Sequence, residues 1–215
     1  MGELYAAMIQ YFQKNGAAFL TQVLQHLRVS GISILAAILI GVPVGIFCSK
    51  SLRLYHVFTS GFGLLRVIPS LALIFVCIPF LGVGELPAVV ALTILAVPPI
   101  LINTALGFRN LPASVLETAV GMGMDAQHIF LRVKVPLAAP LAITGIRTAT
   151  VEVIASATLA AYIGAGGLGQ IIFTGLGLYR MDLLLIGGIS VAILSLSADL
   201  VLSIVEMQVA RRVRA

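Results

Sequence analysis

Four charged side chains lie within or beside long apolar stretches, where a charge is expensive. They are Arg66, Arg147, Glu152 and Asp199. A charge inside a membrane helix costs about 2.5–3.5 kcal/mol on insertion scales, so each is expected to face a pathway or a partner. Arg66 is close enough to the end of its stretch to reach the surface instead. Arg147 should pair with another helix or a second subunit rather than with Glu152, because a five-residue separation is not a same-face spacing. Asp199 is a candidate partner.

Uncharged polar residues accompany Glu152 in the same stretch. Their hydroxyl groups can bond back to carbonyls of their own helix or line an aqueous path, and the acid among them favours the path. Prolines in neighbouring stretches, at positions 69, 79, 98 and 99, would kink their helices in a way that suits a moving gate. The predicted pathway residues are Arg66, Pro69, Ser70, Arg147, Thr148, Thr150, Glu152, Ser156 and Thr158.

A glycine-rich segment matches the pattern G-x-G-x-x-G. Dinucleotide binding would require a preceding strand in a βαβ unit, whereas this segment follows a long apolar run. A helix break with close contact to a neighbouring helix is the favoured interpretation, because small residues let membrane helices approach. The residues concerned are Gly164, Gly166, Gly167 and Gly169.

The sequence gives little support for a catalytic site. An intramembrane hydrolase needs a nucleophile and a base at membrane depth, but His26, His56 and His128 lie near the ends of apolar runs and no G-x-S-x-G turn occurs. Cys48 and Cys77 match no metal-ligand spacing, so we interpret them as packing residues and predict no metal site.

The composition indicates which elements position these residues. Apolar residues make up 60% of the 215 positions and charged residues only 10%, and the mean hydropathy is +1.13. This composition excludes a soluble enzyme and a disordered tail. The net charge of +5 is therefore not interpreted as a sign of nucleic-acid binding. Because a bilayer core needs about 20 helical residues, we predict an all-α integral membrane protein with five spans. The spans are Val29–Ser49, Val67–Gly84, Leu86–Phe108, Pro136–Ile163 and Leu183–Val205.

Three regions are expected along the chain. Residues 1–22 place apolar side chains at roughly helical spacing and predict a short interfacial helix rather than a signal peptide, because Glu3 is present and no basic segment precedes it. Residues 23–210 form the transmembrane domain, which includes a hydrophilic loop at 107–135. Residues 211–215 form a basic tail.

The distribution of basic residues predicts the orientation, because loops rich in Lys and Arg stay in the cytoplasm. With the N-terminus outside and the C-terminus in the cytoplasm, basic residues divide eight to two in favour of the inner side. The inner ones are Lys50, Arg53, Arg109, Arg132, Lys134, Arg211, Arg212 and Arg214, against Lys14 and Arg180 outside. Glu3, Glu85 and Asp182 would also lie outside.

The loop at 107–135 is predicted to form two short helices. Ser114 and Glu117 have the spacing of a capping box, and Pro112 suits a helix entrance. The first helix should end at Gly123, which tolerates positive φ, and Asp125 should cap a second helix that ends at Lys134. Pro136 would then open the fourth span. Apolar side chains for packing are Leu116, Val120, Ile129, Phe130 and Val133.

The same loop resembles the E-A-A, three residues, G, nine residues, I-x-L-P signature of permease subunits from ABC importers. The matching residues are Glu117-Thr118-Ala119, Gly123 and Val133-Lys134-Val135-Pro136. Thr118 replaces an alanine, and valines replace Ile and Leu. The resemblance implies a coupling helix that docks on a separate ATPase. The implied coupling residues are Glu117, Thr118, Ala119, Gly121, Met122, Gly123, Met124, Asp125, Phe130 and Pro136.

A wider resemblance runs from Arg66 to Glu206. It is carried by Arg66–Leu73, Gly121–Met124, Gly145–Val151 and Ala157–Gly169, which look like the osmoprotectant branch that imports glycine betaine, carnitine or choline. Importers of methionine or another small solute are the alternative within the family. A stand-alone secondary carrier is a further alternative, disfavoured by the coupling loop.

The resemblance implies a five-span type I importer permease in the bacterial cytoplasmic membrane. Its partners would be two copies of an ABC ATPase, an identical or paralogous second permease, an extracytoplasmic binding protein and membrane lipid, with no nucleic acid. ATP and Mg²⁺ would bind the ATPase, since this chain has no G-x-x-x-x-G-K-[ST] and is not expected to be an enzyme. The chain has no Trp and only five dispersed Tyr, so an aromatic cage for a quaternary ammonium is expected on the binding protein.

Overall fold

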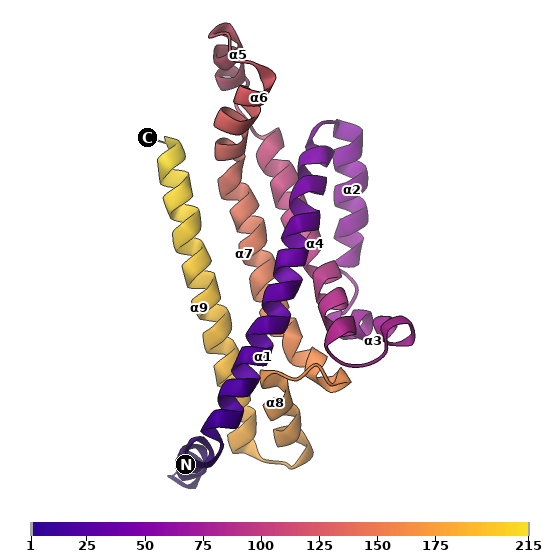
Figure 1. Ribbon diagram of the computed structural model, residues 1–215, viewed down its shortest axis with the longest axis vertical. Helices are drawn as coiled ribbons and strands as arrows, with labels where there is room; N and C mark the ends of the chain where they lie inside the picture. The colour runs from indigo at the N-terminus through magenta and orange to yellow at the C-terminus, as the bar shows by residue number, and fades with distance from the viewer. Residues whose placement is uncertain (1, 215) are drawn as a thin grey trace. The chain divides into compact units, whose positions relative to one another are not determined.

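The computed structural model describes residues 2–214, and helices account for nearly all of them (Figure 1). In chain order the elements are α1 (Gly2–Ser49), α2 (Leu52–Leu65), α3 (Ser70–Leu81), α4 (Glu85–Arg109), α5 (Ala113–Gly121), α6 (Ala126–His128), the π-helix η1 (Ile129–Lys134), α7 (Val135–Ala160), the 3₁₀-helix η2 (Ala161–Ile163), α8 (Leu168–Gly177) and α9 (Met181–Arg214). The predicted all-α class is therefore confirmed.

The chain divides into two compact units, and α1, α4, α7 and α9 each contribute to both. Unit 1 contains the residues up to Ala36 together with Ile68–Ala96 and Thr150–Ala198. Unit 2 contains Ala37–Val67, Val97–Ala149 and the residues from Asp199 onward.

The core of unit 1 forms where α8 meets the first half of α9. Leu168 and Ile171 of α8 are buried together with Leu183 and Ile186 of α9, and Phe19 of α1 is among the residues that pack against them. Burial of about five large apolar side chains at 1.5–3 kcal/mol each is a substantial contribution to folding in water. In a lipid environment the same contacts act mainly through close packing.

Unit 2 is held together by close helix approach at glycines. A Cβ atom at Gly45 of α1 would lie 2.8 Å from the carbonyl oxygen of Leu101 on α4. A Cβ atom at Gly145 of α7 would lie 2.7 Å from the carbonyl oxygen of Pro99, also on α4. These positions exclude any side chain, and the helices gain van der Waals contact along their backbones in return.

Among the described residues, four helices are long and apolar enough to cross a membrane, within Leu4–Ser49, Glu85–Arg109, Ala126–Ile163 and Met181–Arg212. They include the first, third, fourth and fifth predicted spans. The bent pair α2 and α3 brings the count to five if the pair is taken as one span, which agrees with the predicted number.

The second predicted span, Val67–Gly84, is wrong in its boundaries. Helix α3 covers only 12 residues, or about 18 Å, which is short of the hydrocarbon thickness. Pro69 stands at the N-cap of α3, and Gly82 ends the helix with a φ of 77°. Helix α2 lies in the segment predicted to be an inner loop. Together with α3 it can form one bent span.

The N-terminal segment and the first span both belong to α1, which is kinked at Asn15. Within α1 only Asn15 departs from helical dihedrals, with φ −122° and ψ 16°, and no break occurs at residue 22. An interfacial position for residues 1–22 stays a prediction. The side chains of Glu3 and Arg214, and Ala215 of the basic tail, lie outside the described residues.

Candidate coupling loop and polar cluster

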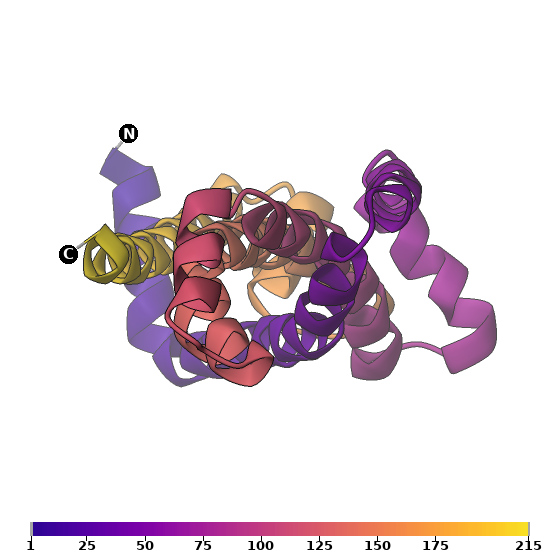
Figure 2. The same cartoon turned by 90° about the horizontal axis from the view of Figure 1, so that it is seen from above.

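The loop of unit 2 consists of α5, a tight turn and α6, and Figure 2 shows this segment folded back on itself. Gly123 lies in the turn with a φ of 79°, and its amide donates to the Val120 carbonyl at 2.9 Å. The Met124 amide donates to the Ala119 carbonyl at 3.2 Å. The turn predicted at Gly123 is therefore present, and it uses a conformation that side-chain-bearing residues rarely adopt.

The predicted capping box is wrong. Helix α5 begins at Ala113 with Pro112 as its N-cap, and no side chain caps it. Ser114 therefore lies inside the helix, and its carbonyl accepts a hydrogen bond from the Thr118 hydroxyl at 2.8 Å. The fixed φ of proline, −62° here, suits a helix entrance, and the helix starts two residues too early for Ser114 to act as its cap.

Asp125 caps α6, as predicted. Its carboxylate accepts from the His128 amide at 2.8 Å and contacts the His128 Nδ1 at 2.9 Å. These hydrogen bonds, first from the amide and then from the ring, lower the pKa of Asp125. Because a lowered pKa favours the ionised form, the cap is complete at neutral pH and is lost only in strong acid.

The second loop helix does not end at Lys134. Helix α6 continues through η1 into α7 without interruption, and the Val135 amide donates to the Phe130 carbonyl. The wider spacing of a π-helix, in which each amide bonds five residues back, coincides with the position before Pro136. The second half of the coupling loop, from Ala126, and the fourth span therefore form one continuous helical element.

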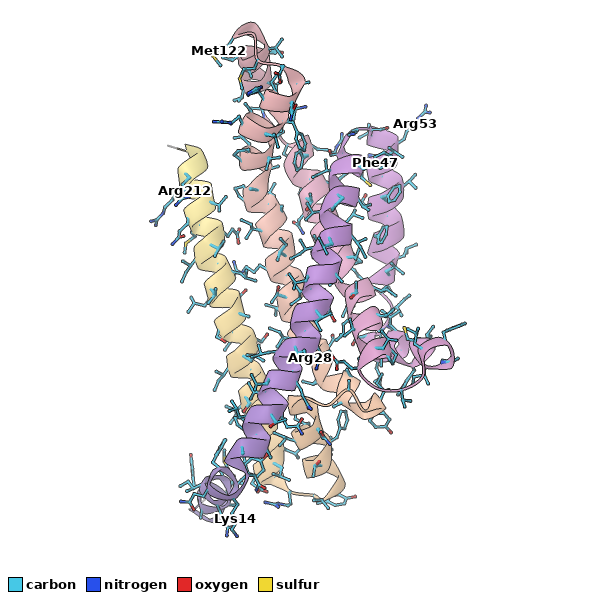
Figure 3. The ribbon with its side chains drawn as sticks, viewed as in Figure 1. Lys14, Arg28, Phe47, Arg53, Met122 and Arg212 are labelled. Atoms are coloured by element: carbon cyan, nitrogen blue, oxygen red, sulfur yellow. The ribbon has the colours of Figure 1, made fainter. Side chains whose placement is uncertain are left out.

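The predicted coupling residues differ in how accessible they are. Met122 lies at the tip of the loop and is 70% exposed (Figure 3). Ala119 is buried, and the ring of Phe130 stacks on Phe108 of α4 at 5.9 Å between centroids, so these two side chains pack within unit 2. Met124 and Pro136 are half-buried. The exposed members, which we call the loop tip, are Glu117, Thr118, Gly121, Met122, Gly123 and Asp125.

A polar cluster joins α7 to α9 in unit 2. The Arg147 guanidinium donates to Asp199 from Nε at 2.5 Å and from Nη2 at 2.8 Å. A third bond runs from Nη1 to Glu206 at 3.4 Å, and the Thr144 hydroxyl donates to the same carboxylate at 2.8 Å. The predicted pairing of Arg147 with Asp199 is confirmed. Glu206 was missed, although it lies seven residues after Asp199 and so on the same helical face.

The predicted pathway residues fall in both units. Arg66, Arg147 and Thr148 belong to unit 2, whereas Pro69, Ser70, Thr150, Glu152, Ser156 and Thr158 belong to unit 1. The hydroxyl groups of Thr148 and Thr158 bond back to their own helix, to the carbonyls of Thr144 and Ala155. A common pathway for these residues stays a prediction.

The glycine-rich segment of unit 1 ends η2 and leads into α8. Gly164, Gly166 and Gly167 have φ values of 84°, 73° and 83°. Gly169 lies inside α8, where a Cβ atom would overlap the backbone of Thr158 on α7. The segment therefore combines a break in the helix with a close helix contact.

A polar cavity of about 310 Å³ lies beside these glycines in unit 1. Gln25, Arg28, Glu85 and Gln170 contribute to its walls. Arg28 and Glu85 form an ion pair at 3.2 Å. This site was not predicted from the sequence, although both residues directly precede predicted spans at what would be their outer ends, where Arg28 is a third basic residue beside Lys14 and Arg180.

Packed apolar helices, a glycine break and an exposed helical loop define a membrane transport subunit of the permease class. The fold agrees with that of a solved inward-facing MetNI methionine ABC transporter, with a TM-score of 0.77, 22% identity and coverage of 88% of this chain and 95% of that chain. At this identity the match shows the fold alone.

The chain belongs to the family of binding-protein-dependent transport system inner membrane components, which matches residues 17–214. It is 44% identical over 200 residues to the carnitine transport permease protein OpuCB of Listeria monocytogenes, covering 93% of this chain and 92% of the relative. It is 38% identical over 199 residues to the choline transport system permease protein OpuBB of Bacillus subtilis strain 168, with coverage of 93% and 92%. The resemblance to ABC importer permeases is thereby confirmed.

Proposed function

We propose that this chain is the membrane subunit of an ATP-driven importer of quaternary ammonium osmoprotectants such as glycine betaine, carnitine and choline. The observation that carries the proposal is identity of 38–44% to carnitine and choline permeases over more than nine-tenths of the chain. The fold match to a methionine transporter is compatible with the alternative substrate but rests on only 22% identity.

The proposed complex contains two ATPase copies, a second permease and an extracytoplasmic binding protein. The loop tip docks on the ATPase, which holds ATP and Mg²⁺. The N-terminus lies outside and the C-terminus lies in the cytoplasm, because this arrangement keeps most basic loop residues inside.

The continuity of α6, η1 and α7 suggests how the loop tip acts on the transmembrane helices. The short turn at residues 122–125 joins the loop tip to α6, so a displacement of the loop that moves α6 would also move α7 as a lever, because α6 is continuous with α7. The Arg147–Asp199 ion pair would carry the same displacement to α9 within unit 2. A movement of the ATPase at the loop tip would thus displace α7 and α9 together.

The substrate class is tested by reconstituting the permease with its ATPase and binding protein in vesicles. We expect ATP-dependent uptake of labelled glycine betaine, carnitine or choline, with no competition from a large excess of methionine. Methionine uptake in place of these solutes would overturn the proposed substrate class. The permease alone should hydrolyse no ATP, and appreciable hydrolysis by it would contradict its role as a subunit.

The orientation is tested by cysteine labelling in intact cells. The native Cys48 and Cys77 are buried and should not react. Asn110→Cys, in the connection after α4, and Leu178→Cys, after α8, introduce thiols at exposed positions. A membrane-impermeant maleimide should label Leu178→Cys in intact cells, and Asn110→Cys only after the membrane is opened. The reverse pattern would contradict the proposed orientation.

A further inference from the structure

A groove in unit 2 lies where η1 and the start of α7 face the end of α9. It is lined by Arg132, Val133, Pro136, Leu137, Val209 and Arg212, and its volume is about 490 Å³. We call it the basic groove. Figure 3 labels Arg212 on the last turns of α9. Arg132, Val133 and Pro136 belong to the coupling loop and its signature, but none of the groove residues is a member of the loop tip or of the polar cluster.

The two arginines of the basic groove are exposed and lack an anionic partner among the described side chains. The ion pairs of this unit engage Asp125, Asp199 and Glu206 with His128 and Arg147 instead. Glu206 is the acid on α9 nearest in sequence to the groove, and its carboxylate already accepts from Arg147 and Thr144. The groove therefore has two guanidinium groups whose charge is available to a ligand.

The arrangement of charge along the groove is asymmetric. Arg132 precedes Val133 and Leu137 on one wall, and Arg212 follows Val209 on the other. Because α9 runs antiparallel to α7 (Figure 1), both arginines lie at the same end of the groove, toward the coupling loop. Both arginines lie near the ends of the candidate spans Ala126–Ile163 and Met181–Arg212, and the apolar groove residues Val133, Leu137 and Val209 lie closer to the middle of those spans. One end of the groove thus attracts an anion and the other attracts hydrocarbon.

We propose that the basic groove binds an anionic phospholipid of the inner leaflet, with the phosphate between Arg132 and Arg212 and an acyl chain along the apolar wall. Guanidinium groups bind phosphate oxygens through paired hydrogen bonds. Basic pockets between membrane helices on the cytoplasmic side bind lipid head groups in this way. A free phosphate would use only the charged end, and an ATPase segment would need the groove to be free of lipid.

Native mass spectrometry of the detergent-purified permease–ATPase complex tests the site directly. The complex is titrated with phosphatidylglycerol and, separately, with phosphatidylcholine. We expect the wild type to bind phosphatidylglycerol at least about tenfold more tightly, since each basic residue near a lipid surface contributes about 1 kcal/mol. Arg132→Gln/Arg212→Gln should remove most of this preference.

A charge-matched control separates a specific site from general attraction. Lys50→Gln/Arg53→Gln removes two positive charges from the same unit, one just before α2 and one in its first turn, and should keep the wild-type preference. An equal loss in both double variants, or no loss in Arg132→Gln/Arg212→Gln, would overturn the proposal. If that variant fails to fold, Arg132→Lys/Arg212→Lys keeps the charge but not the paired geometry, and a wild-type preference there would refute guanidinium recognition.

Two further arms identify the occupant. Millimolar inorganic phosphate should displace little bound phosphatidylglycerol, because it lacks the acyl chain; complete displacement would identify a free-phosphate site instead. Bound lipid should survive assembly with the ATPase, and its presence on the isolated permease but not on the complex would identify the ATPase as the occupant. None of these readouts depends on the transported solute, so the lipid site and the proposed function can fail separately.

Discussion

Arg147 on α7 binds Asp199 on α9 through two parallel hydrogen bonds, of 2.5 Å from Nε and 2.8 Å from Nη2. Paired geometry of this kind is the strongest form of carboxylate recognition by arginine. Glu206 adds a second acid at 3.4 Å, so the cluster contains one positive and two negative groups. Both carboxylates therefore depend on Arg147 for their positive partner in this cluster.

Replacing Arg147 with leucine should therefore destabilise the protein more than removing the pair. Arg147→Leu leaves Asp199 and Glu206 on one face of α9 without a cation, whereas Arg147→Leu/Asp199→Leu removes one of the two acids as well. The single variant should lower the melting temperature by about 2–4 °C, and the double variant by less. Melting is followed with a thiol-reactive fluorophore that reports exposure of the buried Cys48 and Cys77.

Transport by the same variants checks the lever role of α7. Arg147→Leu should reduce uptake in reconstituted vesicles as well as folded yield. Full uptake and normal yield would show that α7 and α9 need no ion pair.

The spans could be predicted from the sequence because a bilayer imposes a minimum length on apolar helices. That rule located α4 almost to the residue, since Glu85 and Arg109 flank an unbroken apolar run. It was wrong for α3, because a charge-free run does not reveal that Pro69 and Gly82 shorten the helix. It also missed α2, because 14 residues are too few to cross a bilayer and Arg53 and His56 interrupt the apolar run.

Of the local features predicted for the loop, two are present, and the capping box at Ser114 is not, because α5 begins before that residue. The turn at Gly123 and the cap at Asp125 depend on neighbours within a few residues, and both are present. Glu206 and the cavity at Arg28 and Glu85 depend on contacts between helices distant in sequence. Spacing within one helix indicates a shared face but not the helix that the face will meet.

Gly169 provides a test of close packing in unit 1. A Cβ atom there would overlap the Thr158 backbone, which cannot move aside as a flexible side chain would. Gly169→Ala should cost about 1–3 kcal/mol of stability through overpacking. Gly177→Ala is the matched control, because a Cβ atom at that end of α8 meets nothing within 4 Å. Equal melting temperatures for the two variants would contradict the packing described here.

Asp125 provides a test of the loop's rigidity. Asp125→Ala removes the cap of α6 and should accelerate hydrogen exchange at the His128 amide, whereas Asp125→Asn keeps an acceptor oxygen and should change it less. The lowered pKa of Asp125 means that the effect should be constant from neutral to mildly acidic pH and should disappear only in strong acid. Exchange that is equally fast in all three proteins would show that the cap does not order the loop.

Gly123 tests whether the loop couples the permease to ATP hydrolysis. A Cβ atom at Gly123 would meet nothing within 4 Å, so the cost of a substitution there comes from its φ of 79° rather than from a clash. Gly123→Val should strain the turn and displace the loop tip, because a β-branched residue strongly disfavours positive φ. Gly123→Asn should be milder, since asparagine tolerates that conformation, and Glu117→Lys should act in the same direction as Gly123→Val but more weakly.

Membrane abundance and ATPase stimulation are measured together in these variants. Gly123→Val should reach the membrane at near-normal levels yet lose substrate uptake and the stimulation of ATP hydrolysis by binding protein and substrate. Gly61→Val is the control: Gly61 is an exposed glycine of α2 with equally open space and no positive φ, so its variant should keep wild-type stimulation. If Gly123→Val also retained wild-type stimulation, the conformation of this turn would have no part in coupling, and the ATPase would have to engage the permease through another surface.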